Sequence, residues 1–216
     1  MKKVLIVVAR RYNGHELWTS LGVLQKSGVG FEVISSDKLI WDEVTGQANT
    51  IERTIDDVDN LPDDVDGLMV VSGNMKDTEA YWTNERVLRY VSEAYAADLP
   101  IAAICCSVPT IRSAAYKRRV SFFPLVRSRM LLGDAGAILS NLSMEVDGRL
   151  VTAENQMMSQ MWATNYVAVL RGEEPALTLR ESGFVAGRGR ERKPIPEVER
   201  LKASRKTIVV PLDEGL

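Results

Sequence analysis

Three runs of small or branched apolar residues recur along the first half of the chain, at residues 3–9, 67–71 and 100–104. Polar and apolar positions do not alternate within these runs. That pattern favours strands covered on both faces, as in a parallel sheet between helices, over strands with one face in water. A further strand is predicted at residues 31–35, which are rich in apolar and β-branched side chains.

The segments between these strands show helical periodicity. Residues 15–26 carry leucines at helical spacing and end at a serine and a glycine, which is a common helix stop. Residues 83–97 repeat the pattern before the third aliphatic run. The opening 35 residues therefore predict a β-α-β unit, and the chain an α/β fold. Residues 37–66 are irregular, and we assign no element there.

The second half of the chain predicts shorter strands and two more helices. Helices are expected at residues 107–116 and 156–170. Two short strands, at residues 137–139 and 150–152, flank a hairpin-type turn at residues 146–149. The apolar residues of the last helix are interpreted as core residues: Met157, Met161, Trp162, Val167 and Leu170.

The composition fits one folded domain followed by an arm. Of the 216 residues, 45% are hydrophobic and 26% are charged, and the formal net charge of −2 indicates no general affinity for nucleic acid. We assign residues 1–172 to the α/β domain and residues 173–216 to an extended arm. Residues 187–206 hold eight Lys or Arg against three Glu, with little apolar periodicity. Residues 207–211 form either one more strand or a segment that docks on a neighbouring subunit.

Two absences in the sequence narrow the class of protein. The chain has no apolar run of about 18 residues, and its first apolar stretch lacks the cleavage site of a secretory signal. We therefore expect a cytoplasmic protein without a membrane partner. The two cysteines are neighbours and form no CxxC pair. We expect neither a structural disulfide nor a bound metal or cofactor.

The strand at residues 100–104 runs directly into Cys105, Cys106 and the following helix, with no glycine or proline at the turn. A tight strand-to-helix corner of this kind exposes its first side chain, and the first N–H groups of the helix point to what binds beside it. Cys105 is therefore the candidate nucleophile, with an acidic thiol, and Cys106 is expected to turn into the fold. The alternative is that both cysteines are small buried core residues.

A nucleophilic thiol needs a neighbouring group that manages its proton. The chain has one histidine, His15, and it stands beside Glu16 at the start of the first predicted helix. Glu16 and Cys105 both follow strands of one parallel sheet, so they can converge at its carboxyl edge. Glu16 would then have a raised pKa and would shuttle the proton. The alternative is an ordinary acid at a helix amino terminus.

Several of these segments together resemble the ThiJ/PfpI superfamily, which includes a Parkinsonism-associated protein deglycase, PfpI-type proteases, glyoxalase III enzymes and isocyanide hydratases. Residues 103–109 read A-I-C-C-S-V-P and are similar to that family's A-I-C-H-G-P corner, while residues 71–74 read V-S-G-N and are similar to its P-G-G-N loop. The resemblance implies a flavodoxin-like, doubly wound, mostly parallel sheet between helices, and a homodimer.

The resemblance also implies roles for particular residues. It makes Cys105 the nucleophile and Glu16 the glutamate that hydrogen-bonds it. The backbone N–H groups of Gly73 and Cys106 would form the oxyanion pocket. Asn74 of the same loop and His15 beside Glu16 are the further candidate substrate-binding residues.

The departures from the family pattern decide which activity we predict. The histidine after the family's cysteine is replaced by Cys106, and residues 122–155 contain no histidine. We therefore predict a cysteine-dependent hydrolase, hydratase or lyase, glyoxalase- or deglycase-like, that acts on a small molecule. Two alternatives stay open: a non-enzymatic redox sensor or chaperone of the same superfamily, and a cysteine peptidase that uses His15.

Overall fold

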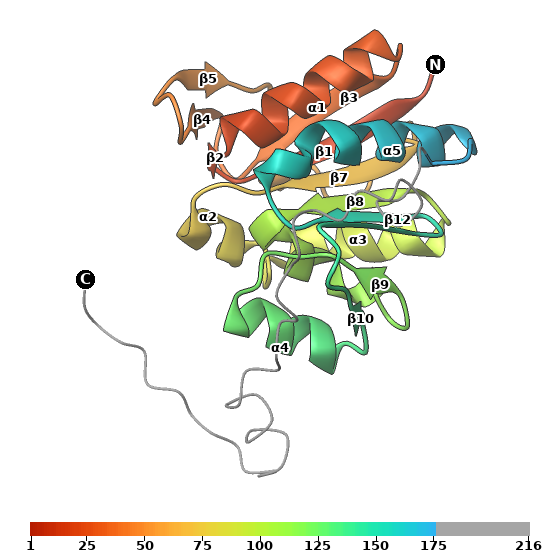
Figure 1. Ribbon diagram of the computed structural model, residues 1–216. Coiled ribbons are helices and arrows are strands. Elements are labelled where there is room, and N and C mark those ends of the chain that lie inside the picture. The colour runs from red at the N-terminus through yellow and green to blue at the C-terminus, as the bar shows by residue number, and fades with distance from the viewer. Residues whose placement is uncertain (176–216) are drawn as a thin grey trace, which may run out of the picture.

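The computed structural model describes residues 1–175 and has a seven-stranded sheet at its centre (Figure 1). The strand order is β11-β12-β8-β7-β1-β3-β6, and neighbouring strands are parallel except for β11, which runs antiparallel to β12. The strands are β1 (Lys3–Val8), β3 (Gly30–Ser35), β6 (Arg53–Thr54), β7 (Gly67–Val71), β8 (Ile101–Ile104), β11 (Met144–Asp147) and β12 (Leu150–Ala153).

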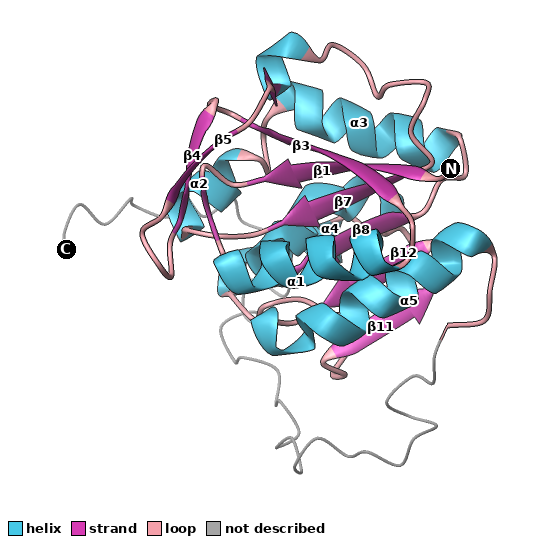
Figure 2. Cartoon of the chain, turned by 90° about the horizontal axis from the view of Figure 1, so that it is seen from above, coloured by secondary structure: helices cyan, strands magenta, loops and turns pink. Residues whose placement is uncertain are grey.

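Helices cover both faces of this sheet. Helices α1 (Gly14–Lys26) and α5 (Ser159–Arg171) pack together on one face, where Figure 2 shows them side by side in front of the strands. Helix α3 (Glu85–Ala96) and the 3-10 helix η2 (Cys105–Ala114) pack on the other. The doubly wound, mostly parallel α/β fold predicted from the sequence is therefore confirmed.

Strand β1 shows why the aliphatic runs contain no polar positions. Its alternate side chains serve two cores: Val4 and Ile6 pack under α1 and α5, whereas Leu5 and Val7 pack against α3 and η2. Successive side chains of a strand point to opposite faces, so a strand with a helix layer on each side buries every residue. All four of these side chains are fully buried.

The remaining elements border the central sheet. A three-stranded sheet consists of β2 (Arg11–Tyr12), β4 (Leu39–Asp42) and β5 (Ala48–Thr50), and a two-stranded sheet of β9 (Arg119–Val120) and β10 (Ile138–Leu139). The short helices are α2 (Met75–Ala80), α4 (Val126–Asp134), η1 (Ile55–Asp57) and η3 (Gln156–Met158). Elements β4, β5, β6 and η1 fill the region to which we had assigned no element.

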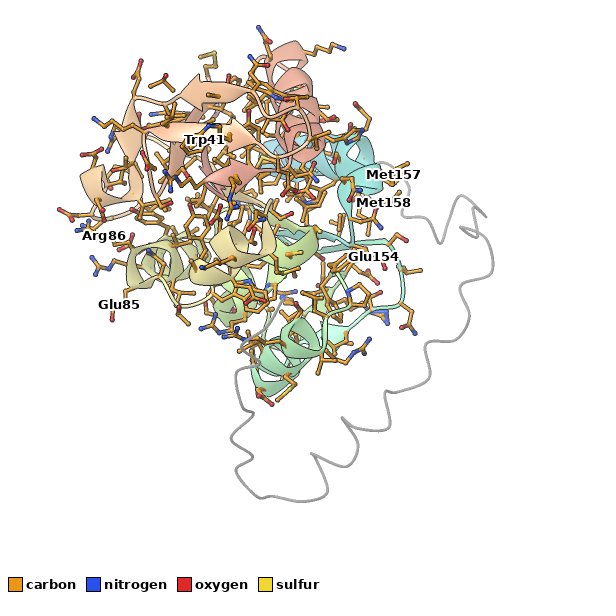
Figure 3. The ribbon with its side chains drawn as sticks, turned by 90° about the vertical axis from the view of Figure 1, so that its left-hand side faces the viewer. Trp41, Glu85, Arg86, Glu154, Met157 and Met158 are labelled. Carbon is orange, nitrogen blue, oxygen red and sulfur yellow. The ribbon has the colours of Figure 1, made fainter. Side chains whose placement is uncertain are left out.

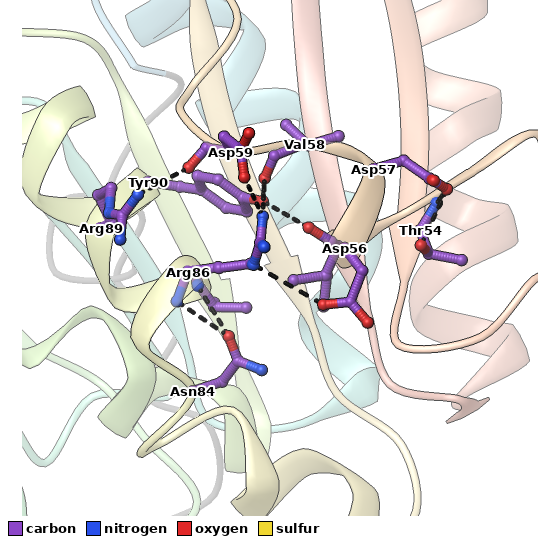
Figure 4. Close-up of polar contacts among 11 residues, drawn as sticks. Thr54, Asp56, Asp57, Val58, Asp59, Asn84, Arg86, Arg89 and Tyr90 are labelled. Atoms are coloured by element: carbon purple, nitrogen blue, oxygen red, sulfur yellow. Dashed lines mark hydrogen bonds and ion pairs between the residues drawn. The ribbon is translucent and has the colours of Figure 1, made fainter.

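Polar contacts fasten η1 and the loop after it to α3 (Figure 4). The Tyr90 hydroxyl hydrogen-bonds the carbonyl oxygens of Ile55, at 3.1 Å, and of Val58. The Arg86 guanidinium pairs with Asp59. Burial raises the pKa of Tyr90 to about 12, so it remains a neutral donor at physiological pH. These contacts give an irregular segment a fixed place beside the sheet.

The predicted hairpin turn is present, but the strand predicted at residues 137–139 is not one of the two strands that it joins. Asp147 pairs directly with Leu150, which leaves Gly148 (φ +61°) and Arg149 as a two-residue turn. Such a turn joins a strand to the segment immediately before it. The partner of β12 is therefore β11, and β10, the observed form of the predicted strand at residues 137–139, pairs instead with β9.

Two predicted helices also differ from the observed ones. The helix after the cysteines is a 3-10 helix that contains Pro109 and bends at Ile111 (φ −92°, ψ 17°), rather than an α-helix. The last helix opens with the 3-10 turn η3, and there Met157 is 74% exposed and projects from the surface instead of packing in the core (Figure 3). Trp162, Val167 and Leu170 are buried as predicted.

No helix within residues 1–175 combines the length and the apolar character needed to cross a membrane. The predicted arm lies outside the described residues from residue 176 onward, and so does the strand expected at residues 207–211.

The contact between β7 and α5 gives the first testable prediction. A Cβ atom at Gly67 would lie 2.2 Å from the Tyr166 hydroxyl oxygen and 3.1 Å from the Pro100 carbonyl oxygen. Gly67→Ala should therefore lower the free energy of unfolding by about 1–3 kcal/mol. The matched control is Gly22→Ala in α1, where no described atom outside the adjacent helix backbone lies within 4 Å of the added carbon; it should raise stability by about 0.5–1 kcal/mol. Urea unfolding of both variants measures this, and a stabilised Gly67→Ala variant would contradict it.

Candidate functional site

The strand-to-helix corner after β8 places Cys105 in a left-handed backbone conformation. Its φ is +59°, a region that non-glycine residues rarely occupy. The Ser107 hydroxyl closes the corner: it accepts a hydrogen bond from the Ile104 N–H at 3.1 Å and lies 2.7 Å from the carbonyl oxygens of Ile104 and Val70. The backbone of the corner is thereby tied to both β8 and β7, and Cys105 is held at the carboxyl end of the sheet.

Glu16 is fully buried at the same end of the sheet, in the first turn of α1. Ser72, directly after β7, donates two hydrogen bonds to one of its oxygens, Oε2: the backbone N–H at 3.0 Å and the hydroxyl at 2.8 Å. The other oxygen, Oε1, is buried without a hydrogen-bond partner in the described part of the chain. A carboxyl group with no exposure does not fit the alternative of an ordinary, solvated first-turn acid.

The surroundings of Glu16 favour its neutral form. Burial raises its pKa well above the ordinary value of 4.5, the nearby Cys105 raises it further, and the hydrogen bonds from Ser72 lower it by less. The raised pKa predicted from the sequence is therefore confirmed. Because both Ser72 donors occupy Oε2, Oε1 is the oxygen that is free to carry the proton of the neutral carboxyl group.

The two cysteine thiols lie against each other. Their Sγ atoms are 3.5 Å apart, and both residues are buried. Contact with Cys106, together with burial, raises the pKa of the Cys105 thiol, while the Ser72 hydroxyl and the Cys106 N–H lower it by less. The prediction of an acidic Cys105 is therefore wrong. The Cys106 thiol and burial raise this pKa by more than the Cys106 N–H, at the start of the 3-10 helix, lowers it.

Gly73 does not have the surroundings that we predicted for an oxyanion donor. Its N–H already donates to the Thr78 hydroxyl at 3.0 Å. A Cβ atom at this position would lie 2.0 Å from the Arg11 carbonyl oxygen and 2.5 Å from the Tyr12 Cα atom. The glycine is required because the backbone of β2 approaches it closely. The Cys106 N–H, the other predicted donor, interacts with the Cys105 thiol.

Asn74 and His15, the other two candidate residues, are directed elsewhere. The Asn74 side-chain oxygen accepts a hydrogen bond from Arg11 at 3.1 Å, and Arg11 also pairs with Asp77 at 2.8 Å. His15 is exposed, whereas Glu16 beside it is buried. Consecutive residues of an α-helix point about 100° apart, so the two side chains do not both enter the site.

A cleft of about 490 Å³ lies between β4 and the start of α2. It is lined by Arg10, Arg11, Trp41, Asp42, Glu43, Gly46 and Asp77. The Arg10 guanidinium lies 4.8 Å from the centre of the Trp41 ring, which Figure 3 shows on this side of the molecule. Cys105 and Glu16 do not line this cleft. Within residues 1–175 no three His, Cys, Asp or Glu side chains form a group suited to a metal ion.

Two residues of the site were not predicted as functional. Ser72 entered the predictions only as part of the V-S-G-N loop, without a role of its own, yet its hydroxyl contacts both Glu16 and Cys105. The available signal was its position, since a hydroxyl directly after a buried strand lies at the same edge of the sheet as Cys105. Trp82 donates its indole N–H to the Cys106 carbonyl oxygen at 2.9 Å and so holds the backbone behind the thiols. It comes from a separate segment, and the sequence carried no signal for it.

These features define a flavodoxin-like α/β protein with a cysteine at a strand-to-helix corner and a buried glutamate beside it. The model of the DJ-1/PfpI family matches residues 2–168, and the chain belongs to this family.

Known proteins resemble this chain in sequence and in fold. The uncharacterised protein MJ0967 of Methanocaldococcus jannaschii is 31% identical over 156 residues, which cover 71% of this chain and 75% of that protein. A ThiJ/PfpI domain protein from Brachyspira murdochii superposes with a TM-score of 0.70 at 18% identity, over 80% of this chain and 98% of that one. Schizosaccharomyces pombe DJ-1 superposes with a TM-score of 0.65 at 16% identity, over 79% of this chain and 97% of that chain. These structures share the fold of this chain.

The buried, neutral Glu16 gives a prediction for stability against pH. In the unfolded chain Glu16 loses its proton near its ordinary pKa, whereas the folded chain keeps the proton to a higher pH. The free energy of unfolding therefore falls as pH rises from about 4.5 through the folded pKa, by up to about 1.4 kcal/mol per pH unit from this group. Glu16→Gln should remove that dependence. Urea unfolding of both proteins between pH 5 and 8 measures it; curves that stay parallel would exclude a raised pKa.

The contact between the thiols predicts how fast Cys105 is alkylated. Because Cys106 raises the pKa of Cys105, Cys106→Ala should increase the rate of iodoacetamide modification at Cys105 near pH 7. Ser72→Ala should decrease that rate, since the Ser72 hydroxyl lowers the same pKa. Mass spectrometry of timed digests measures both. Equal rates in the wild type and Cys106→Ala would show that the second thiol does not control the first.

Proposed function

We propose that this protein is a cysteine-dependent enzyme that adds the Cys105 thiol to an electrophilic carbon of a small molecule, such as an aldehyde, an imide or an isocyanide. Membership of the DJ-1/PfpI family supports a catalytic cysteine. The observation that carries the proposal is the Ser72 hydroxyl, which hydrogen-bonds Glu16 and contacts the Cys105 thiol. It supplies a short path for a proton between nucleophile and acid.

The proposed addition step moves three protons in one direction. The Cys105 thiol proton passes to the Ser72 Oγ, and the Ser72 hydroxyl proton passes to Oε2 of Glu16, across the existing 2.8 Å hydrogen bond. The proton on Oε1 passes to the substrate oxygen as the S–C bond forms and the C=O bond becomes a single bond. An aldehyde thus yields a hemithioacetal, and no thiolate has to exist beforehand. Glu16 acts as general acid and general base at once.

Breakdown of the adduct uses the same residues in reverse. As the S–C bond of the product adduct breaks, Glu16 returns a proton through Ser72 to the departing sulfur, which regenerates the Cys105 thiol. The buried position of Glu16 keeps bulk water from exchanging these protons. The reaction as a whole is a hydrolysis, a hydration or a lyase reaction, according to what attacks or leaves the bound carbon.

A non-enzymatic redox sensor or chaperone is the second candidate, and the observation that favours it is the contact between the two thiols at 3.5 Å. Turnover on a small carbonyl compound separates the two functions. The peptidase alternative required His15 to act on Cys105, and its exposed position gives that alternative no support.

The relay predicts how two variants behave once a substrate has been found in a screen of small aldehydes, imides and isocyanides. Glu16→Gln removes the exchangeable proton and should lower kcat by about 10²–10⁴-fold, the effect typical of a lost general acid or base. Ser72→Ala keeps one backbone hydrogen bond to Glu16 but interrupts the path, and should lower kcat with little change in KM.

The chain offers matched controls for both changes. Glu85 is an exposed acid in the first turn of α3, and Ser92 is an exposed serine of the same helix. Glu85→Gln and Ser92→Ala should leave turnover unchanged. Wild-type turnover in both Glu16→Gln and Ser72→Ala would exclude the relay, whereas loss in Glu16→Gln alone would confine the proton transfer to Glu16.

A further inference from the structure

The nucleophilic corner carries a second thiol that the proposed addition step does not use. Cys105 and Cys106 are the two cysteines of the whole chain. Their Sγ atoms lie 3.5 Å apart, and Cys105 is 9% and Cys106 5% exposed. Two buried thiols in contact can form a disulfide or act together as a bidentate ligand, and their geometry distinguishes the two.

A disulfide between these residues is disfavoured. The Cα atoms of neighbouring residues are about 3.8 Å apart across a trans peptide, and the described residues contain no cis peptide bond. Disulfide-linked cysteines ordinarily have Cα atoms about 4.4–6.8 Å apart, and their sulfurs must approach to about 2.05 Å. The observed sulfur separation would have to shrink by about 1.5 Å while the Cα atoms stay too close.

The same sulfur–sulfur separation suits chelation of a single atom by both thiols. An atom about 2.3 Å from each sulfur, a usual thiolate–metal distance, would see the two sulfurs at an angle of roughly 100°. A zinc ion needs three or four protein ligands, and residues 1–175 offer no group of three suitable side chains. An atom that already carries its third substituent, and needs only two sulfur ligands from the protein, fits this pair of thiols better than a zinc ion does.

We propose that Cys105 and Cys106 form a dithiol site that binds one monosubstituted trivalent arsenical, R–As=O, as the representative of soft, thiophilic centres. Two S–As bonds form, and the oxygen leaves as water with the two thiol protons, so no atom changes oxidation state. The Ser107 hydroxyl holds the corner in the conformation that keeps both sulfurs on one side. The inference does not depend on the proposed function, because it needs neither Glu16 nor turnover.

The test is binding of phenylarsine oxide to the full-length reduced protein, followed by titration of free thiols and by intact mass. We expect one equivalent to bind and both thiols to disappear per arsenic atom. Cys105→Ser and Cys106→Ser should each weaken binding at least about 100-fold, because chelation makes the second bond intramolecular. Excess 2,3-dimercaptopropanol should release the arsenical, and the same concentration of a monothiol should not.

Several results would overturn the site. Loss of one thiol per arsenic atom in the wild type, or binding of two equivalents, would show that the cysteines react separately. A single serine variant with wild-type affinity would show the same. The wild-type thiol count decides the matter even if a variant unfolds, and thermal melting identifies that case. Stoichiometric binding of Zn²⁺ at equal concentration would show that the site is not selective for two-thiol chelation.

Discussion

The left-handed backbone of Cys105 is the constraint on which the rest of the site depends. A non-glycine residue at φ +59° costs about 1–2 kcal/mol relative to ordinary conformations. The fold offsets this cost with the Ser107 hydrogen bonds to β8 and β7 and with the Trp82 hydrogen bond to the next carbonyl. If those contacts were lost, the corner would relax, and the Cys105 thiol would lose its place beside the Ser72 hydroxyl.

The burial of the Glu16 carboxyl group and the Cys105 thiol determines which protonation states this corner favours. A buried carboxyl group and a buried thiol each resist ionisation, and each would be harder to ionise if the other were already charged. The resting site therefore holds both protons, as the raised pKa values of Glu16 and Cys105 indicate. Chemistry at such a site has to move protons in concert with bond formation instead of starting from a stored thiolate. The placement of Ser72 between the two groups is consistent with that requirement.

Much of the fold could be predicted from the sequence, because strands with helices on both faces must be apolar throughout. The runs at β1, β7 and β8 carry this signal in consecutive residues, and the helices between them carry it in their periodicity. Strands of two or three residues, such as β5, β6 and β9, carry too little pattern to be found. The pairing of β12 was missed because it depends on which segment directly precedes a two-residue turn.

The candidate site was predictable only where position along a strand determined it. Glu16 and Cys105 come to one edge of the sheet because parallel strands end there, and the sequence shows where those strands end. The state of the Cys105 proton could not be predicted, because it depends on the rotamer of Cys106 and on the 3-10 geometry of the corner. The partner of the Gly73 N–H depends on how α2 turns after the loop, and that helix was not foreseen either.

The close approach of β2 to Gly73 bears on how sequence motifs evolve in this fold. Any side chain at that position collides with the main chain of Arg11 and Tyr12, so selection for a stable fold alone is enough to retain the glycine. The neighbouring residue, Ser72, is retained for a different reason, because its side chain donates a hydrogen bond to Glu16. Within one short loop, the glycine therefore reflects how closely two backbones pack, whereas the serine beside it reflects the polar contacts of Glu16.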